Sequence, residues 1–106
     1  MEITDKPELD EILSKNALTA AMFYAGWCPY SRRLKPMFEN FTGDKKGFEF
    51  VSVKIDEDDN PLWDKYEIKA VPTLIFFRGS DIILRMDARP GRGLDQEDID
   101  KALSSF

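Results

Sequence analysis

The sequence predicts an α/β domain in which helices cover both faces of a mixed β-sheet. Three observations support this prediction. Apolar residues recur at helical spacing in some segments, and form continuous or alternating runs typical of strands in others. The two kinds of segment alternate along most of the chain, which indicates parallel crossovers. The last two strand-like segments follow each other directly, as in an antiparallel hairpin, so the sheet should be mixed.

The first half of the chain supplies two predicted helices and a buried strand. Asp5 and Pro7 provide a cap and a first-turn proline for a helix that reaches about Lys15. Residues 17–25 are nearly all apolar, which predicts a central strand buried on both faces. A second helix is predicted over residues 31–41, where apolar side chains repeat at i, i+3, i+4 and i+7. These are Leu34, Met37, Phe38 and Phe41.

The second half supplies three strands and two helices. The predicted strands are residues 48–56, 74–77 and 82–86, the last two joined by a tight turn at Arg78-Gly79-Ser80-Asp81. Asn60 followed by Pro61 marks the start of a short helix through Tyr66. Asp95 caps a final helix, in which Ile99 begins an apolar stripe that ends at Phe106.

A loop of five residues, Arg89-Pro90-Gly91-Arg92-Gly93, separates the last strand from the final helix. Its glycines and proline favour a turn exposed to solvent. The alternative is that Arg89 and Arg92 hold an anionic group of a substrate, such as a carboxylate.

Length and composition exclude several classes of protein. The chain has 106 residues, which fits one domain over residues 1–106. Its net charge of −5 and the lack of a long basic block argue against nucleic acid or an anionic membrane as partner. No stretch approaches the roughly 20 apolar residues of a membrane span. The N-terminus lacks the features of a secretory signal and a single cysteine excludes an internal disulfide, so we expect a cytoplasmic protein.

The chain has no histidine. This excludes a Cys-His hydrolase pair and argues against the common zinc sites. We therefore expect no metal and no cofactor.

The only cysteine, Cys28, lies in the pentapeptide Trp27-Cys28-Pro29-Tyr30-Ser31. The pentapeptide joins the predicted buried strand to the second helix. At a helix N-terminus, free backbone N–H groups and the helix dipole favour the reactive thiolate. The alternative is a buried structural cysteine, which is the commoner fate of a single Cys. The aromatic and turn-forming neighbours favour an exposed elbow, and hence a reactive thiol.

Four features, taken in chain order, resemble the thioredoxin family over nearly the whole chain. They are Phe23-Tyr24-Ala25-Gly26-Trp27-Cys28-Pro29-Tyr30-Ser31, then Pro36, then Lys54-Ile55-Asp56 with Asn60-Pro61, and finally Tyr66-Glu67-Ile68-Lys69-Ala70-Val71-Pro72-Thr73. The resemblance implies a three-layer sandwich around a mixed four-stranded sheet, with a short fifth strand at the N-terminus as an alternative. It also implies that Pro72 is cis and faces Cys28. The residues expected to contact substrate are Trp27, Pro29, Tyr30, Val71 and Pro72, with the Val71 backbone pairing with an extended peptide.

The chain departs from the family pattern at three positions. Ser31 stands where the family motif has a second cysteine, Met22 where many members have a buried Asp, and Ser52 where a Lys often accompanies that Asp. The dipeptide Pro29-Tyr30 is typical of glutaredoxins instead.

These departures limit the predicted chemistry. A dithiol reductase attacks a substrate disulfide with one thiolate and resolves the mixed disulfide with a second thiol. Cys28 can perform the first step, whereas the Ser31 hydroxyl cannot perform the second. Ser31 can still donate a hydrogen bond to the Cys28 thiolate.

We predict a thiol–disulfide oxidoreductase, without full dithiol turnover, that acts on disulfide-containing proteins. Two explanations of Ser31 stay open. The chain is either a dithiol enzyme whose second cysteine was exchanged to trap partners, or a natural monothiol enzyme. In both cases an external reductase or a low-molecular-weight thiol must complete the reaction. The alternative is a non-catalytic module that binds extended peptides at the same surface.

Overall fold

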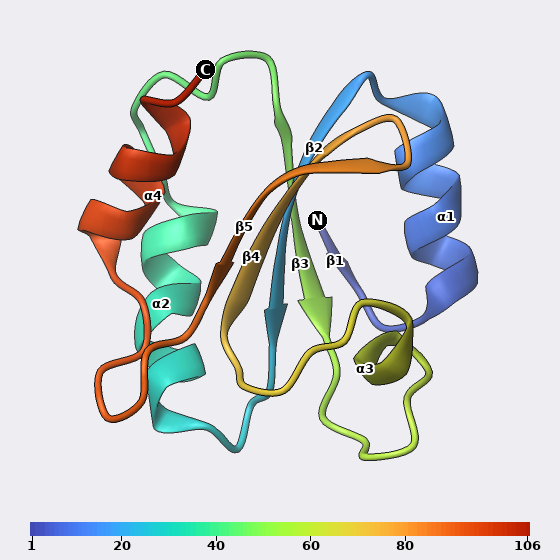
Figure 1. Cartoon of the computed structure of the whole chain (residues 1–106), viewed down its shortest axis with the longest axis vertical. Helices are drawn as coiled ribbons and strands as arrows, with labels where there is room; N and C mark the ends of the chain where they lie inside the picture. Colours follow the sequence, from blue (N-terminus) through green and yellow to red (C-terminus); the bar gives the residue numbers. More distant parts are fainter.

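A five-stranded sheet divides the molecule into two helical layers (Figure 1), as described by a computed structural model of residues 1–106. The strands are β1 (Glu2–Ile3), β2 (Leu18–Tyr24), β3 (Glu49–Lys54), β4 (Thr73–Arg78) and β5 (Asp81–Asp87). Their order is β1-β3-β2-β4-β5, in which β1, β3 and β2 are parallel and β4 and β5 antiparallel to their neighbours. The predicted mixed sheet is confirmed, and it includes the short N-terminal strand.

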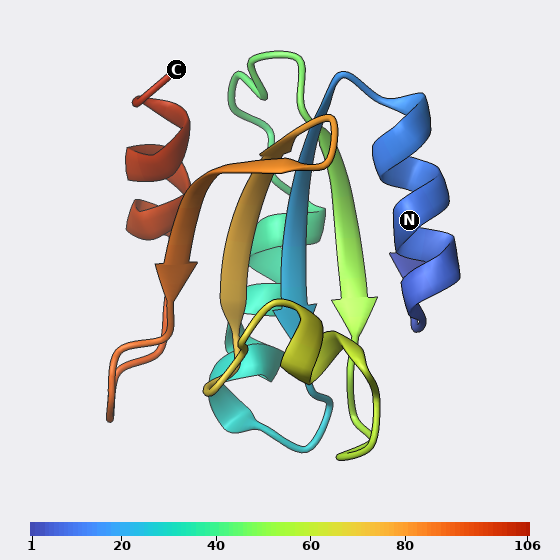
Figure 2. The ribbon, with the colours of Figure 1, turned by 45° about the vertical axis from the view of Figure 1, so that its right-hand side comes forward.

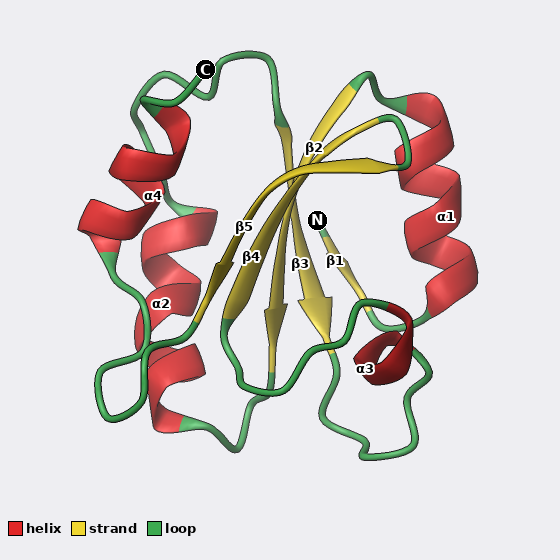
Figure 3. Cartoon of the chain, viewed as in Figure 1, coloured by secondary structure: helices red, strands yellow, loops and turns green.

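Four helices cover the two faces (Figure 3): α1 (Lys6–Lys15), α2 (Pro29–Glu39), α3 (Leu62–Lys65) and α4 (Gln96–Leu103). Apolar residues of α1 and α3 pack against one face of the sheet, and those of α2 and α4 against the other. Figure 2 shows α1 and α4 on opposite sides of the twisted sheet. None of these helices is both long enough and apolar enough to span a membrane.

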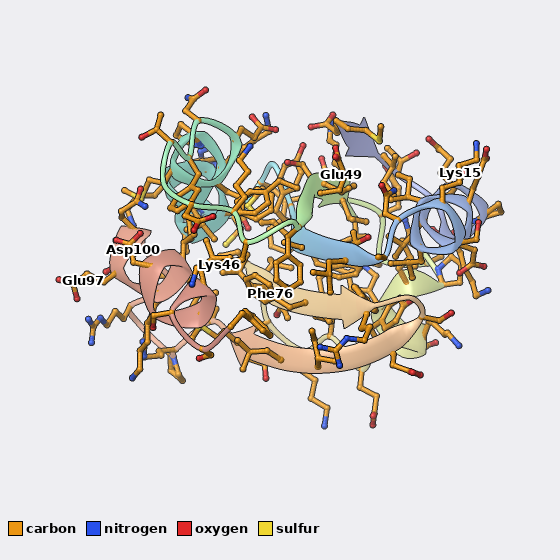
Figure 4. All side chains as sticks on the ribbon, turned by 90° about the horizontal axis from the view of Figure 1, so that it is seen from above. Lys15, Lys46, Glu49, Phe76, Glu97 and Asp100 are labelled. Atoms are coloured by element: carbon orange, nitrogen blue, oxygen red, sulfur yellow. The ribbon has the colours of Figure 1, made fainter.

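The central strand β2 is buried on both faces, which explains why polar and apolar residues do not alternate in its sequence. Ala21 and Phe23 point into the core under α1 and α3, while Ala20 and Met22 point into the core under α2 and α4. All four are fully buried, so both faces select apolar residues. On the neighbouring strand β4, the fully buried Phe76 points into the core under α2 and α4 (Figure 4).

Two helix starts follow the predicted capping residues. The Asp5 carboxylate accepts the Glu8 N–H at 3.0 Å. At α3 the N-cap is Pro61, one residue later than predicted, although the Asn60 side chain accepts the Leu62 N–H at 3.0 Å. At α4 the Asp95 carboxylate accepts the Glu97 N–H at 3.1 Å. Local hydrogen bonds of this kind need no information from distant parts of the chain.

Two helix ends differ from the prediction. Helix α2 stops at Glu39 and α4 at Leu103, so Phe41 and Phe106 lie beyond them. The Phe106 ring instead packs against Phe48, with ring centroids 4.8 Å apart. Phe106 therefore fits the helical spacing in the sequence, but it is selected for an apolar contact that it makes beyond the end of the helix.

Candidate functional site

The residues singled out by the sequence meet at one end of the sheet. Trp27 and Cys28 follow the end of β2, Pro29 begins α2, and Val71 and Pro72 precede β4. In Figures 1 and 2 the start of α2 and the segment before β4 lie together at the lower end of the molecule. Cys28 is the N-cap residue of α2, which places it at the predicted helix N-terminus.

The Cys28 thiol lies just beneath the surface. The residue is 8% exposed, and its Sγ donates to the Val71 carbonyl oxygen at 3.5 Å. The expectation of an exposed elbow was wrong for Cys28 itself, because the Val71 segment folds over the sulfur. It holds for the neighbouring Trp27, which is 56% exposed.

The segment before β4 presents its backbone to the site. The Val71–Pro72 peptide bond is cis. While the Val71 carbonyl accepts from Cys28, the Val71 N–H takes part in no hydrogen bond of the chain. A backbone donor beside the thiol is thus left without a partner in the chain.

Ser31 has a different partner from the one expected. It is fully buried, and its Oγ accepts the Ala25 N–H at 3.3 Å. No hydrogen bond joins it to Cys28, so the expected donation to the sulfur is absent. The hydroxyl turns toward the end of β2 because the Ala25 N–H has no other acceptor there.

Asp56, to which the sequence analysis assigned no function, fixes the loop that carries Trp27. Its Oδ1 accepts the Gly26 N–H at 2.7 Å, and its backbone oxygen accepts the Trp27 indole N–H at 3.0 Å. A charge-assisted bond of this length is among the stronger hydrogen bonds in proteins. Only the family-like Lys54-Ile55-Asp56 sequence could have drawn attention to this residue.

The loop over residues 89–93 packs against the site through its last residue. Gly93 is buried with φ +72°, and a Cβ there would lie 2.8 Å from the Tyr30 Cβ. The Arg33 guanidinium lies 5.7 Å from the centroid of the Tyr30 ring and donates to the Arg92 carbonyl at 2.5 Å. The tip of the loop is exposed, as predicted, but its base forms a wall of the site.

An ion pair between the buried Asp98 and the exposed Arg89 holds this loop to α4. The Asp98 carboxylate is 3% exposed, pairs with both terminal nitrogens of Arg89, and accepts the Asp95 N–H at 2.9 Å. Arg89 is exposed, as a solvated loop predicts, but its guanidinium is paired with Asp98, contrary to the interpretation that it holds a ligand. Sequence reasoning missed this pair because the two residues belong to different elements.

The Arg89–Asp98 pair predicts a pH-dependent stability. The Arg89 guanidinium lowers the pKa of the Asp98 carboxyl from its ordinary value of 3.8. Since the pKa is depressed in the folded state, the stabilisation is complete above about pH 5 and is lost as the pH falls below 3.8. We expect Asp98→Ala to lower the free energy of unfolding by about 1–3 kcal/mol at pH 7. Urea unfolding at pH 7 and at about pH 3 should show the difference from wild type shrinking with acid.

Asp100→Ala is the matched control, because Asp100 is an exposed carboxylate on the same helix. Its loss should stay within about 0.5 kcal/mol at both pH values. Equal losses for the two variants at pH 7 would contradict the assigned ion pair.

The family model, the related sequences and the solved structures that match this chain all point to the same family. A family model described as Thioredoxin matches residues 1–104. The chain is 45% identical over 76 residues to a thioredoxin of Mycoplasmoides gallisepticum, covering 72% of this chain and 75% of that protein. It is 30% identical over 86 residues to thioredoxin 2 of Chlorobaculum tepidum, covering 80% and 78%. Among solved structures, Plasmodium falciparum thioredoxin superposes with a TM-score of 0.83 at 22% identity, over 99% of this chain and 97% of that one.

Proposed function

The chain belongs to the thioredoxin family of thiol–disulfide oxidoreductases, and from that premise we propose that Cys28 attacks substrate disulfides. The supporting observation is the position of the only sulfur nucleophile. Cys28 caps α2 and contacts the Val71 carbonyl, between an exposed Trp27 and a free backbone N–H. At a helix N-terminus, unpaired backbone N–H groups and the helix dipole in general favour a thiolate.

The proposed step conserves electrons and atoms. The Cys28 thiolate attacks one sulfur of the substrate disulfide, and a Cys28–substrate disulfide forms as the substrate S–S bond breaks. The second substrate sulfur leaves as a thiolate and takes a proton from water. Met22, fully buried where many relatives have an acid, cannot supply that proton.

The shape of the site favours a protein substrate. No cavity of the structure is lined by Cys28, Trp27, Tyr30, Val71 or Pro72. Small-molecule sites are usually concave, whereas an extended peptide can pair with a free backbone donor on an open surface. We assign the Val71 N–H to that pairing, with Trp27, Pro29, Tyr30 and Pro72 around the substrate cysteine.

Ser31 makes the reaction stop after one step. A hydroxyl cannot displace the substrate from Cys28, so an external reductase or a low-molecular-weight thiol must attack the mixed disulfide. One external thiol attacks the Cys28 sulfur and releases the reduced substrate. A second thiol then attacks the disulfide so formed, which restores the Cys28 thiol and leaves a disulfide between the two external sulfurs. This requirement applies both to a trapping variant of a dithiol enzyme and to a natural monothiol enzyme. A reducing cytoplasm, where we place the protein, would supply such thiols.

The proposal is tested by following the mass of the intact protein in the presence of a disulfide-containing protein. We expect a one-to-one adduct that persists until glutathione is added and then disappears, with reduced substrate released. Cys28→Ala should form no adduct. If the adduct resists glutathione but yields to a thioredoxin reductase, the trapping variant is favoured over the monothiol enzyme.

The low exposure of Cys28 favours one alternative, a peptide-binding module without catalysis. That alternative predicts that Cys28→Ala binds partners as tightly as the wild type and that the wild type forms no adduct. Binding measured by calorimetry beside the mass experiment separates the two functions.

A further inference from the structure

Three arginines beside the site have no carboxylate partner. Arg32 donates to the Gly26 carbonyl at 3.2 Å, and Arg33 donates to the carbonyls of Arg92 and Leu94 at 2.5 and 3.4 Å. The Arg92 guanidinium makes no hydrogen bond, and none of the ion pairs of the structure includes Arg32, Arg33 or Arg92. Backbone carbonyls hold the Arg32 and Arg33 side chains in place without neutralising their charge, and the Arg92 side chain is exposed.

Two carboxylates at the start of the adjoining helix are already engaged. Asp98 is paired with Arg89, and Asp95 caps the N-terminus of α4. The contact of Gly93 with Tyr30 sets the neighbouring Arg92 at the edge of the site. We call Arg33 and Arg92, which meet at the Arg92 carbonyl, the basic wall; Arg32 lies instead against Gly26, in the loop of Trp27.

The other side of the site carries the opposite charge. Glu57, Asp58 and Asp59 follow β3, are exposed, and take part in no ion pair. The preceding residue, Asp56, accepts hydrogen bonds from Gly26 and Trp27, which attaches this acidic turn to the loop of the nucleophile. In Figures 1 and 2 the turn after β3 and the loop before α4 lie at the same end of the molecule, with the start of α2 between them.

We propose that this site selects substrates by the order in which acidic and basic residues flank the disulfide cysteine. The preferred partner is an extended protein segment with acidic residues on one side of its disulfide cysteine and basic residues on the other. Acidic side chains would face the basic wall, and basic side chains the acidic turn. Charges at the rim of an interface act mainly on the association rate and on the choice of partner. The inference rests on the proposed function, because it concerns segments that Cys28 captures.

Two peptides of identical composition test the proposal. Each carries one cysteine in a disulfide with a neutral aromatic thiol, flanked by acidic residues on its N-terminal side and lysines on its C-terminal side, or the reverse. Capture by Cys28 forms the peptide disulfide and releases the coloured aromatic thiolate, so the rate is followed by absorbance. We expect one order to react about three- to tenfold faster at about 20 mM salt. The ratio should approach one at about 0.5 M salt, where charges are screened.

Arg92→Glu should reduce the ratio at low salt at least twofold. Arg78→Glu is the matched control, since Arg78 is an exposed arginine at the end of β4 remote from Pro72. It makes the same change in net charge and should leave the ratio unaltered. Equal rates for the two peptides, or equal effects of the two variants, would overturn the inference. Failure to capture either peptide would instead contradict the proposed function.

Discussion

Ser31→Cys is expected to convert a protein that reacts once into one that turns over. Residue 31 lies three positions after Cys28, in the first turn of α2. Positions three apart on a helix share a face, so the new thiol would lie near the mixed disulfide. It would attack the Cys28 sulfur, release reduced substrate and leave an intrachain disulfide for an external reductant.

The expected gain follows from making the second step intramolecular. Intramolecular attack replaces a collision with an external thiol, and well-oriented groups gain large effective concentrations. With a disulfide-containing protein and a reductase, we expect at least about a hundredfold more turnovers for Ser31→Cys than for the parent. The measurement is consumption of the reductase's electron donor per mole of protein.

Ser31→Ala is the control for this gain. It removes the acceptor of the Ala25 N–H, which should lower the free energy of unfolding by about 1 kcal/mol. Adduct formation by Cys28 should persist, still without turnover. If Ser31→Cys accumulates the same long-lived adduct as the parent, the assignment of Ser31 as the missing resolving position is wrong.

Gly93→Ala is expected to lower the free energy of unfolding and to displace Tyr30 in the site. The added Cβ would lie 2.8 Å from the Tyr30 Cβ and 3.0 Å from two of its ring carbons, and the backbone has φ +72°. The positive φ alone costs about 1 kcal/mol for a residue with a Cβ, and overpacking adds about 1–3 kcal/mol. Displacement of Tyr30 should also slow capture of disulfide peptides by Cys28.

Gly91→Ala separates the cost of a positive φ from the cost of overpacking against Tyr30. Gly91 has φ +70°, yet an added Cβ there meets nothing within 4 Å. Urea unfolding of both variants should therefore show the larger loss for Gly93→Ala, and only that variant should react more slowly. Equal losses in both would mean that the contact between the loop and Tyr30 contributes nothing.

Local rules predicted much of the fold. The apolar run of β2 and the caps at Asp5 and Asp95 depend on neighbours within a few residues, so the sequence alone defines them. Helix ends were less predictable, because Phe106 extends a helical stripe through contacts with another element.

The sequence predicted the position of Cys28 at the start of α2 but not its contacts. Cys28 was expected at a helix N-terminus, and it lies there. Its burial depends on Val71, which lies 43 positions away in the chain. The contact between Gly93 and Tyr30 likewise joins segments that no local pattern relates.

The most direct test of the account compares Cys28 in the folded protein with Cys28 in a peptide of residues 24–33. Both react with the same uncharged aromatic disulfide, and the released thiolate gives the second-order rate constant. If the fold activates the sulfur, the protein reacts about tenfold faster than the peptide, or more. A slower reaction in the protein would show that Cys28 is a shielded structural residue, and the proposed chemistry would be wrong.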